Sequence, residues 1–164
     1  MNRLLKVAFA VGLCVVSVAG AAWAQAKPED LLKYRQGVMR ATAFQFGPLV
    51  AVAKGEAQWG PAMAQKAANL AALAVIAGDV FSPASQKIAN SDAKPEIWSK
   101  PDDFKKAMGA FQAATAKLGG LARGGNAEAI KAQIAAVGKT CGGCHDDYEW
   151  WYLGTAPSAP ICWP

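Results

Sequence analysis

Hydrophobic residues recur at steps of three and four along most of this chain, which is the spacing of one face of an α-helix. The first such stretch begins near Lys27-Pro28-Glu29-Asp30, where proline suits a first turn and two acids complement the helix dipole. Its core stripe is predicted to comprise Leu32, Arg35, Met39, Ala43, Phe46 and Val50. Gly47-Pro48 is expected to bend this helix without ending it.

A second helix is predicted from Gly60-Pro61 to about Ala77, and a long connection from Gly78 to Trp98, where Pro, Ser and Asp interrupt the pattern. The candidate core positions of the second helix are Met63, Leu70, Leu73 and Ile76. Ser99, followed three residues later by Asp102, resembles a capping box for a third helix. The stripe of that helix contains Phe104, Met108, Phe111, Thr115 and Leu118, and ends at Gly119-Gly120.

The last periodic stretch follows the turn Arg123-Gly124-Gly125, with Asn126 as a plausible N-cap. Its stripe consists of Ile130, Ile134, Val137, Cys141, Cys144 and Tyr148. Four helices of two dozen residues or fewer, two of them joined by short turns, predict an all-α protein, an antiparallel four-helix bundle. A length of 164 residues fits one domain.

The first 24 residues differ from the rest and predict a secretory signal peptide. Arg3 and Lys6 precede the apolar run Val7–Val18, and Ala22-Trp23-Ala24 offers a signal peptidase cleavage site. The run is short for a bilayer span, and an uncleaved anchor is the alternative. We therefore expect an exported, periplasmic bacterial protein with no membrane attachment after cleavage.

Charge gives little support for a nucleic-acid partner. The formal net charge is +5 and falls to +3 when the signal peptide takes Arg3 and Lys6 with it. The remaining basic residues are scattered, with no run longer than Lys105-Lys106. Nucleic-acid binding would instead call for a concentrated basic patch.

The segment Cys141-Gly142-Gly143-Cys144-His145 has the Cys-x-x-Cys-His spacing of c-type haem attachment. Two thiols add to the two haem vinyl groups, and the following histidine binds the iron as an axial ligand. On a helix, Cys144 and His145 lie three and four residues after Cys141, so all three project to one side. The sequence therefore predicts one covalently bound haem c, with His145 as the metal ligand.

Three other uses of these residues are less consistent with the sequence. A zinc site would need a fourth ligand beyond the motif, and Cys162 is the one cysteine left in the mature chain to supply it. A thioredoxin-like redox pair would call for a βαβ setting, which the pattern lacks. A disulfide between Cys141 and Cys144 would be strained by so short a loop on a helix.

With the haem motif on the last helix, the chain resembles the class II c-type cytochromes, and most closely the cytochrome c prime family. The local signatures shared with that family are Lys27-Pro28-Glu29-Asp30, Tyr34-Arg35-Gln36, Lys94-Pro95-Glu96-Ile97-Trp98-Ser99 and Val137-Gly138-Lys139-Thr140. The resemblance covers roughly Lys27 to Tyr148, and we expect the bundle domain to span residues 25–149.

The resemblance implies roles for five further residues. Arg35 and Gln36 would lie against the haem edge, where a guanidinium can neutralise a propionate. Asp92 would border the haem from the connecting segment, and Phe81 would pack near it. Met39 would face the distal side of the iron. The alternative for Arg35, Gln36 and Asp92 is an ordinary solvated side chain, and Phe81 is expected in the core either way.

The chain departs from the family pattern after Tyr148. Family members commonly continue with a basic residue and end soon afterwards, whereas this chain has Glu149 and then an atypical tail, residues 150–164, which contains Cys162. A basic residue there can shape the proximal side of the haem. Its replacement by Glu149 leaves that side of the site undetermined by the resemblance.

Two functions remain open for such a haem protein. In the first, the iron is five-coordinate, Met39 is an apolar lid, and the protein transfers electrons or binds gases such as NO and CO. In the second, Met39 is the sixth ligand and the protein is purely an electron carrier. An enzyme such as a peroxidase is not expected, because no histidine remains for distal acid-base chemistry once His145 is assigned.

The expected partners are redox proteins, gas ligands and a second copy of the chain. Members of the family are often antiparallel dimers through their first two helices. The alanines Ala67, Ala68, Ala71 and Ala72 would allow such a close approach, or would pack inside the monomer.

Overall fold

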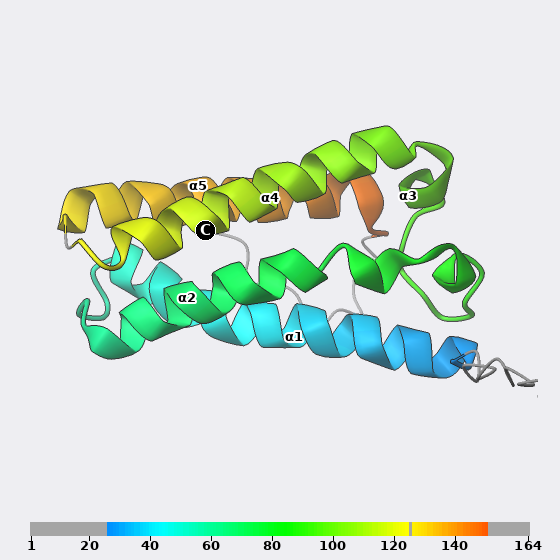
Figure 1. The fold of residues 1–164 in the computed structure, drawn as a ribbon, viewed down its shortest axis with the longest axis horizontal. Coiled ribbons are helices and arrows are strands. Elements are labelled where there is room, and N and C mark those ends of the chain that lie inside the picture. Colours follow the sequence, from blue (N-terminus) through cyan, green and yellow to red (C-terminus); the bar gives the residue numbers. More distant parts are fainter. Residues whose placement is uncertain (1–25, 125, 151–164) are drawn as a thin grey trace, which may run out of the picture.

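The computed structural model describes residues 26–124 and 126–150, and four long helices form its body (Figure 1). These are α1 (Pro28–Ala53), α2 (Pro61–Ile76), α4 (Pro101–Leu121) and α5 (Ala127–Tyr148). Around the bundle α1 packs on α2, α2 on α4, α4 on α5, and α5 on α1. The predicted all-α bundle is confirmed. The predicted signal peptide and nearly all of the tail lie outside the described residues.

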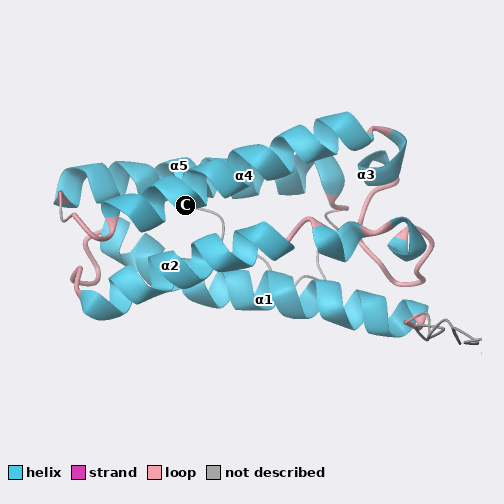
Figure 2. Ribbon diagram, viewed as in Figure 1, coloured by secondary structure: helices cyan, strands magenta, loops and turns pink. Residues whose placement is uncertain are grey.

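The connection between α2 and α4 covers one end of the bundle, beside the start of α1 and the end of α5 (Figure 1). It contains two short 3₁₀ turns, η1 (Asp79–Phe81) and η2 (Pro83–Ser85), and the single-turn helix α3 (Glu96–Ser99). The predicted long connection is therefore present, but it is partly helical. Figure 2 shows that the remaining irregular chain is confined to the two ends of the bundle.

The predicted stripes of α4 and α5 are confirmed, because their members are buried, apart from Cys144, which is partly buried and packs against the core. The stripe of α1 was predicted in part wrongly. Its buried residues are Arg35, Val38, Thr42, Phe46, Leu49 and Val52. Met39, Ala43 and Val50 are only partly buried. Helix α1 packs on both α2 and α5, so its most buried residues face the space between these two helices. Apolar residues flank that face on both sides, and their spacing alone does not show where its centre lies.

In α2 two of the three buried residues are alanines. Ala67, Leu70 and Ala74 are buried, whereas Ile76, a predicted core position, is 36% exposed. A Cβ added at Gly119 of α4 would lie 3.7 Å from the Ala71 Cβ, so the two helices approach closely. Close approach favours alanine and glycine at this contact and places larger side chains of α2 at its edge.

The capping box predicted at Ser99 is wrong. Ser99 belongs to α3, and α4 begins at Pro101 after Lys100, whose side chain makes no capping hydrogen bond. Proline sets the backbone angle of a first helical turn and lacks the N–H that a cap would satisfy, so it starts the helix by itself. The end of α4 also differs slightly, since the helix passes Gly119-Gly120 and ends at Leu121.

The N-cap predicted at Asn126 is confirmed, since its side-chain oxygen accepts a hydrogen bond from the Ala129 N–H at 2.9 Å. Asn126→Ala is expected to reduce the free energy of unfolding by about 1 kcal/mol, because an N–H of the first turn loses its partner. Chemical denaturation of the two proteins measures this. Asn126→Ser is the matched control and should keep most of the stability; equal losses in both variants would contradict a capping role.

Candidate haem site

The cysteines and histidine of the Cys-x-x-Cys-His motif occupy the last two turns of α5. Cys141 is buried, and Cys144 and His145 are partly buried. Both cysteines are thiols, and both pack with the core of the bundle. The predicted placement of this motif on the seam of the last helix is therefore confirmed.

The Cys144 thiol is held in its neutral form. Burial raises its pKa to about 11, and the negative charges of Asp147 and Glu149 add to that effect. A buried site disfavours the thiolate, which is charged, more than the thiol. At neutral pH the side chain is therefore a neutral thiol.

Arg35 is the one buried arginine among the described residues, and it joins α1 to the connecting segment. Its Nη2 donates to the Ser85 carbonyl at 3.0 Å, and its Nη1 donates to the Ser91 hydroxyl at 2.9 Å. Its Nε donates to the Val80 carbonyl at 3.3 Å. One side chain of α1 thus holds together three points of a segment that lies 45 to 56 residues further along the chain.

Aromatic rings surround the Arg35 guanidinium. It lies 4.7 Å from the centre of the Phe81 ring and 5.6 Å from that of Trp98. Phe81 packs edge-on against Phe104, and Phe104 against Tyr148 of α5. Such contacts between a cation and aromatic faces are favourable. They continue as an aromatic chain from Arg35 to the helix that carries the haem motif.

The environment of Arg35 suits an anionic group. Burial lowers the pKa of the guanidinium, and the oxygens that accept its hydrogen bonds are all uncharged. No ion pair between described residues includes it. A buried charge is costly unless it is paired. A carboxylate of a bound cofactor, such as a haem propionate, would supply the missing partner, so these residues fit the cofactor that the motif implies.

The other residues expected at the site are Met39, Gln36 and Asp92. Met39 is partly buried one turn after Arg35 and packs against the core that contains Cys141. The side chains of Gln36 and Asp92 are exposed. The structure thus brings Arg35 and Phe81 together.

Sequence reasoning missed how the end of α5 is held in place. The Lys94 N–H donates to the Tyr148 carbonyl at 2.9 Å, and the Trp150 N–H donates to the Asp92 carbonyl at 2.8 Å. Ala93 forms an antiparallel bridge with Glu149 between these two bonds. This pairing joins residues more than fifty positions apart, so no local pattern signals it.

The second missed feature is a contact between Glu149 and His145. A carboxylate oxygen of Glu149, Oε2, lies within hydrogen-bonding distance of His145 Nδ1. The spacing of four residues on one helix was the available signal.

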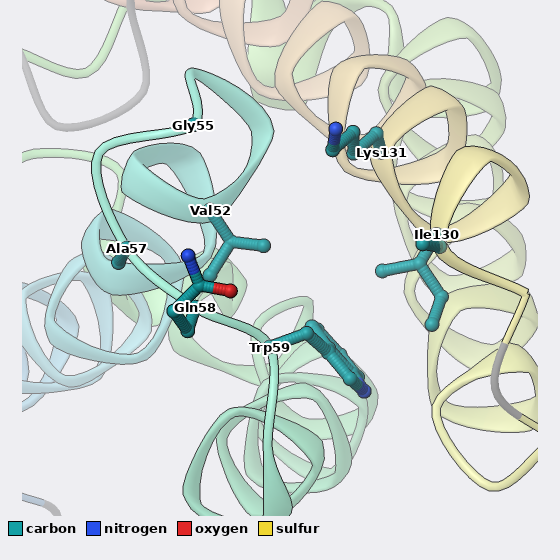
Figure 3. Close-up of a pocket in the computed structure, with 8 residues that line it drawn as sticks. Val52, Gly55, Ala57, Gln58, Trp59, Ile130 and Lys131 are labelled. Atoms are coloured by element: carbon teal, nitrogen blue, oxygen red, sulfur yellow. The ribbon is translucent and has the colours of Figure 1, made fainter.

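A pocket is present at the opposite end of the bundle, between the α1–α2 loop and the start of α5 (Figure 3). Val52, Trp59 and Ile130 line it together with Lys131, and they lie far along the bundle from the haem motif. Over the described ranges we find no cluster of three His, Cys, Asp or Glu side chains arranged to hold a bare metal ion. No helix in the same ranges combines the length and apolarity needed to cross a membrane.

A helical bundle with Cys-x-x-Cys-His on its last helix defines a class of protein, the bundle-type c-type cytochromes. The chain belongs to the cytochrome c prime family, whose model, described as Cytochrome C', matches residues 30–149. Its cofactor is covalently attached haem c. The expectation drawn from the sequence motifs is confirmed.

Curated relatives match over almost their whole length. Cytochrome c' of Alcaligenes xylosoxydans xylosoxydans is 36% identical over 124 residues, covering 76% of this chain and 96% of the relative. Cytochrome c-554 of Cereibacter sphaeroides is 33% identical, covering 87% and 95%. Among solved structures, a ferrous variant of Alcaligenes xylosoxidans cytochrome c prime with bound NO has a TM-score of 0.72 at 35% identity, covering 77% of this chain and 98% of that chain.

Proposed function

We propose that this chain is a periplasmic monohaem cytochrome that transfers electrons and binds NO or CO at a five-coordinate haem iron. The observation that carries the proposal is the motif Cys141–His145 on the α5 seam, together with the buried Arg35, which forms no ion pair within the described part of the chain. Solved relatives named as NO and CO complexes support the choice of ligands.

The proposed roles follow from the chemistry of each side chain. The thiols of Cys141 and Cys144 add to the two vinyl groups, and His145 binds the iron through Nε2, because Nδ1 faces Glu149. The bound haem supplies an iron that changes between the ferric and ferrous states. Phe81 packs beside the cofactor, and Gln36 and Asp92 lie at its exposed edge.

Arg35 is proposed to neutralise a haem propionate. Arg35→Ala is expected to lower the reduction potential, because the removed cation favours the ferrous haem, which carries one positive charge fewer. It should also change the pH dependence of the potential, since the propionate pKa rises without the guanidinium. Redox titrations across neutral pH measure both effects.

Two further variants make the Arg35 experiment specific. Arg35→Lys keeps the charge and should retain most of the potential even if alanine weakens the fold. Arg40→Ala removes an exposed arginine from the same helix and should leave the titration unchanged. Equal titrations for wild type and the alanine variant at Arg35 would contradict the electrostatic role.

Met39 is proposed as a steric lid over the distal side of the iron. Met39 lies one turn after Arg35 and is partly buried against the core. This placement supports a side chain that covers the distal side of the haem and can be displaced by a ligand. The second candidate function keeps the fold and makes Met39 the sixth iron ligand, so that the protein is an electron carrier alone. The substitution Met39→Ala separates the two candidates.

We propose that the protein is not an enzyme, since the sequence contains one histidine and it is assigned to the iron. The proposed partners are redox proteins and, in a homodimer, a second copy of the chain. Ala68 and Ala72 are exposed on α2 and support that contact, whereas Ala67 and Ala71 pack inside the monomer. The predicted signal peptide supports a periplasmic location.

A further inference from the structure

The end of α5 places a carboxylate against the histidine of the haem motif. Glu149 follows His145 by four residues, and its Oε2 lies within hydrogen-bonding distance of His145 Nδ1. Both side chains are about one-third exposed, at 33% and 36%. The contact therefore forms in a partly desolvated setting, where an ionic hydrogen bond is stronger than in water.

The backbone around Glu149 is anchored, so the contact does not depend on a loose chain end. The Glu149 N–H donates to the His145 carbonyl at 3.0 Å, which closes the last turn of α5. On the other side, Ala93 pairs with Glu149, flanked by the hydrogen bonds from Lys94 and Trp150. Both the helix and the connecting segment thus fix the backbone of Glu149.

Lys94, a cation on the connecting segment, has other contacts in the structure. The Lys94 ammonium donates to the Asp146 carbonyl at 2.7 Å and lies 5.3 Å from the centre of the Trp150 ring. The ion pairs found between described residues include Glu149 with His145 and none with Lys94. The Glu149 carboxylate thus faces the imidazole of His145.

We propose that Glu149 accepts the Nδ1–H hydrogen bond of His145 and thereby lowers the reduction potential of the haem. The proposal rests on the proposed function, in which His145 binds the iron through Nε2. A carboxylate bonded to the second nitrogen of a ligating histidine fixes the tautomer and ring orientation and makes the histidine a stronger donor. A stronger donor favours ferric over ferrous iron. Glu149 is a positioning residue, because it acts through His145.

The test compares Glu149→Gln with Asp147→Asn in the haem-loaded protein. Both substitutions remove one negative charge from the same end of α5. Asp147 is exposed, whereas the Glu149 carboxylate lies against His145. Glu149→Gln is expected to shift the ferrous-to-ferric equilibrium at least tenfold toward ferrous, about 59 mV for a one-electron couple. Asp147→Asn is expected to shift it by less than threefold.

A vibrational measurement separates the hydrogen bond from simple charge removal. In resonance Raman spectra of the ferrous protein, the iron–histidine stretching frequency should fall in Glu149→Gln and stay unchanged in Asp147→Asn. If the resting iron is six-coordinate, the same pair is measured in the Met39→Ala background. Equal potential shifts in both variants with an unchanged stretch would overturn the role of Glu149.

The failure of this inference can be told apart from failure of the proposed function. If the haem-loaded Glu149→Gln variant has the same reduction potential and iron–histidine stretching frequency as the wild type, the inference alone is overturned. A chain that retains no haem in denatured mass spectra overturns the proposed function and this assignment together. Glu149→Arg adds a variant that cannot accept a hydrogen bond, and it should raise the potential at least as far as glutamine does.

Discussion

Denaturing mass spectrometry of the chain, expressed with cytochrome maturation machinery, is expected to show one haem retained. The double variant Cys141→Ser/Cys144→Ser is expected to retain none. Two thioether bonds survive denaturation, whereas a haem held only through His145 is lost when the fold opens. The effect is therefore all or none.

A third cysteine offers the matched control. Cys162→Ser should retain the haem as fully as the wild type, because Cys162 lies outside the Cys-x-x-Cys-His motif. Recovery of apoprotein alone from the wild-type chain under these conditions would contradict the proposed attachment. Loss of haem in Cys162→Ser would show that the motif does not act by itself.

Met39→Ala is expected to accelerate CO binding to the ferrous protein about tenfold or more. If Met39 is a lid, a ligand must first displace its side chain, and each 1.36 kcal/mol removed from that barrier is worth about tenfold in rate. The wild-type ferrous protein should then be high-spin. Stopped-flow mixing with CO measures the rate, and the optical spectrum reports the spin state.

The matched control is Met63→Ala. Met63 is also partly buried against the core, but it lies in the first turn of α2, at the end of the bundle away from the haem motif. Its substitution should leave CO binding unchanged. A low-spin wild-type spectrum that Met39→Ala converts to high-spin, with a marked fall in potential, would contradict the lid and support Met39 as the sixth ligand.

The helices of the bundle were largely predictable from residue spacing. The apolar stripes of α4 and α5 are continuous, and each of these helices packs on two neighbours through that stripe. The stripe of α1 was displaced because apolar residues flank it on both sides. Ile76 was misplaced because the spacing does not show that alanines bring α2 close to α4.

Arg35 shows where local sequence stops being informative. Its position on a stripe predicted a buried face, and the structure buries it at 5% exposure. Its partners Val80, Ser85 and Ser91 lie far along the chain, so the neutral oxygens that accept its hydrogen bonds became visible only in the folded molecule. Gln36 and Asp92, by contrast, had no stripe to support them, and both are exposed.

The sequence by itself determined the helices, the haem motif and the order of both along the chain, because each depends on residues within one or two turns of one another. Only the tertiary structure decided which groups surround the charged side chain of Arg35 and what anchors Glu149. Arg35 lies among neutral oxygens and aromatic rings because the connecting segment folds over the start of α1. Glu149 lies four residues after His145, and the pairing of residues 92–94 with the end of α5 anchors its backbone there. Both arrangements join chain segments more than forty positions apart, and such contacts are set by packing rather than by local periodicity.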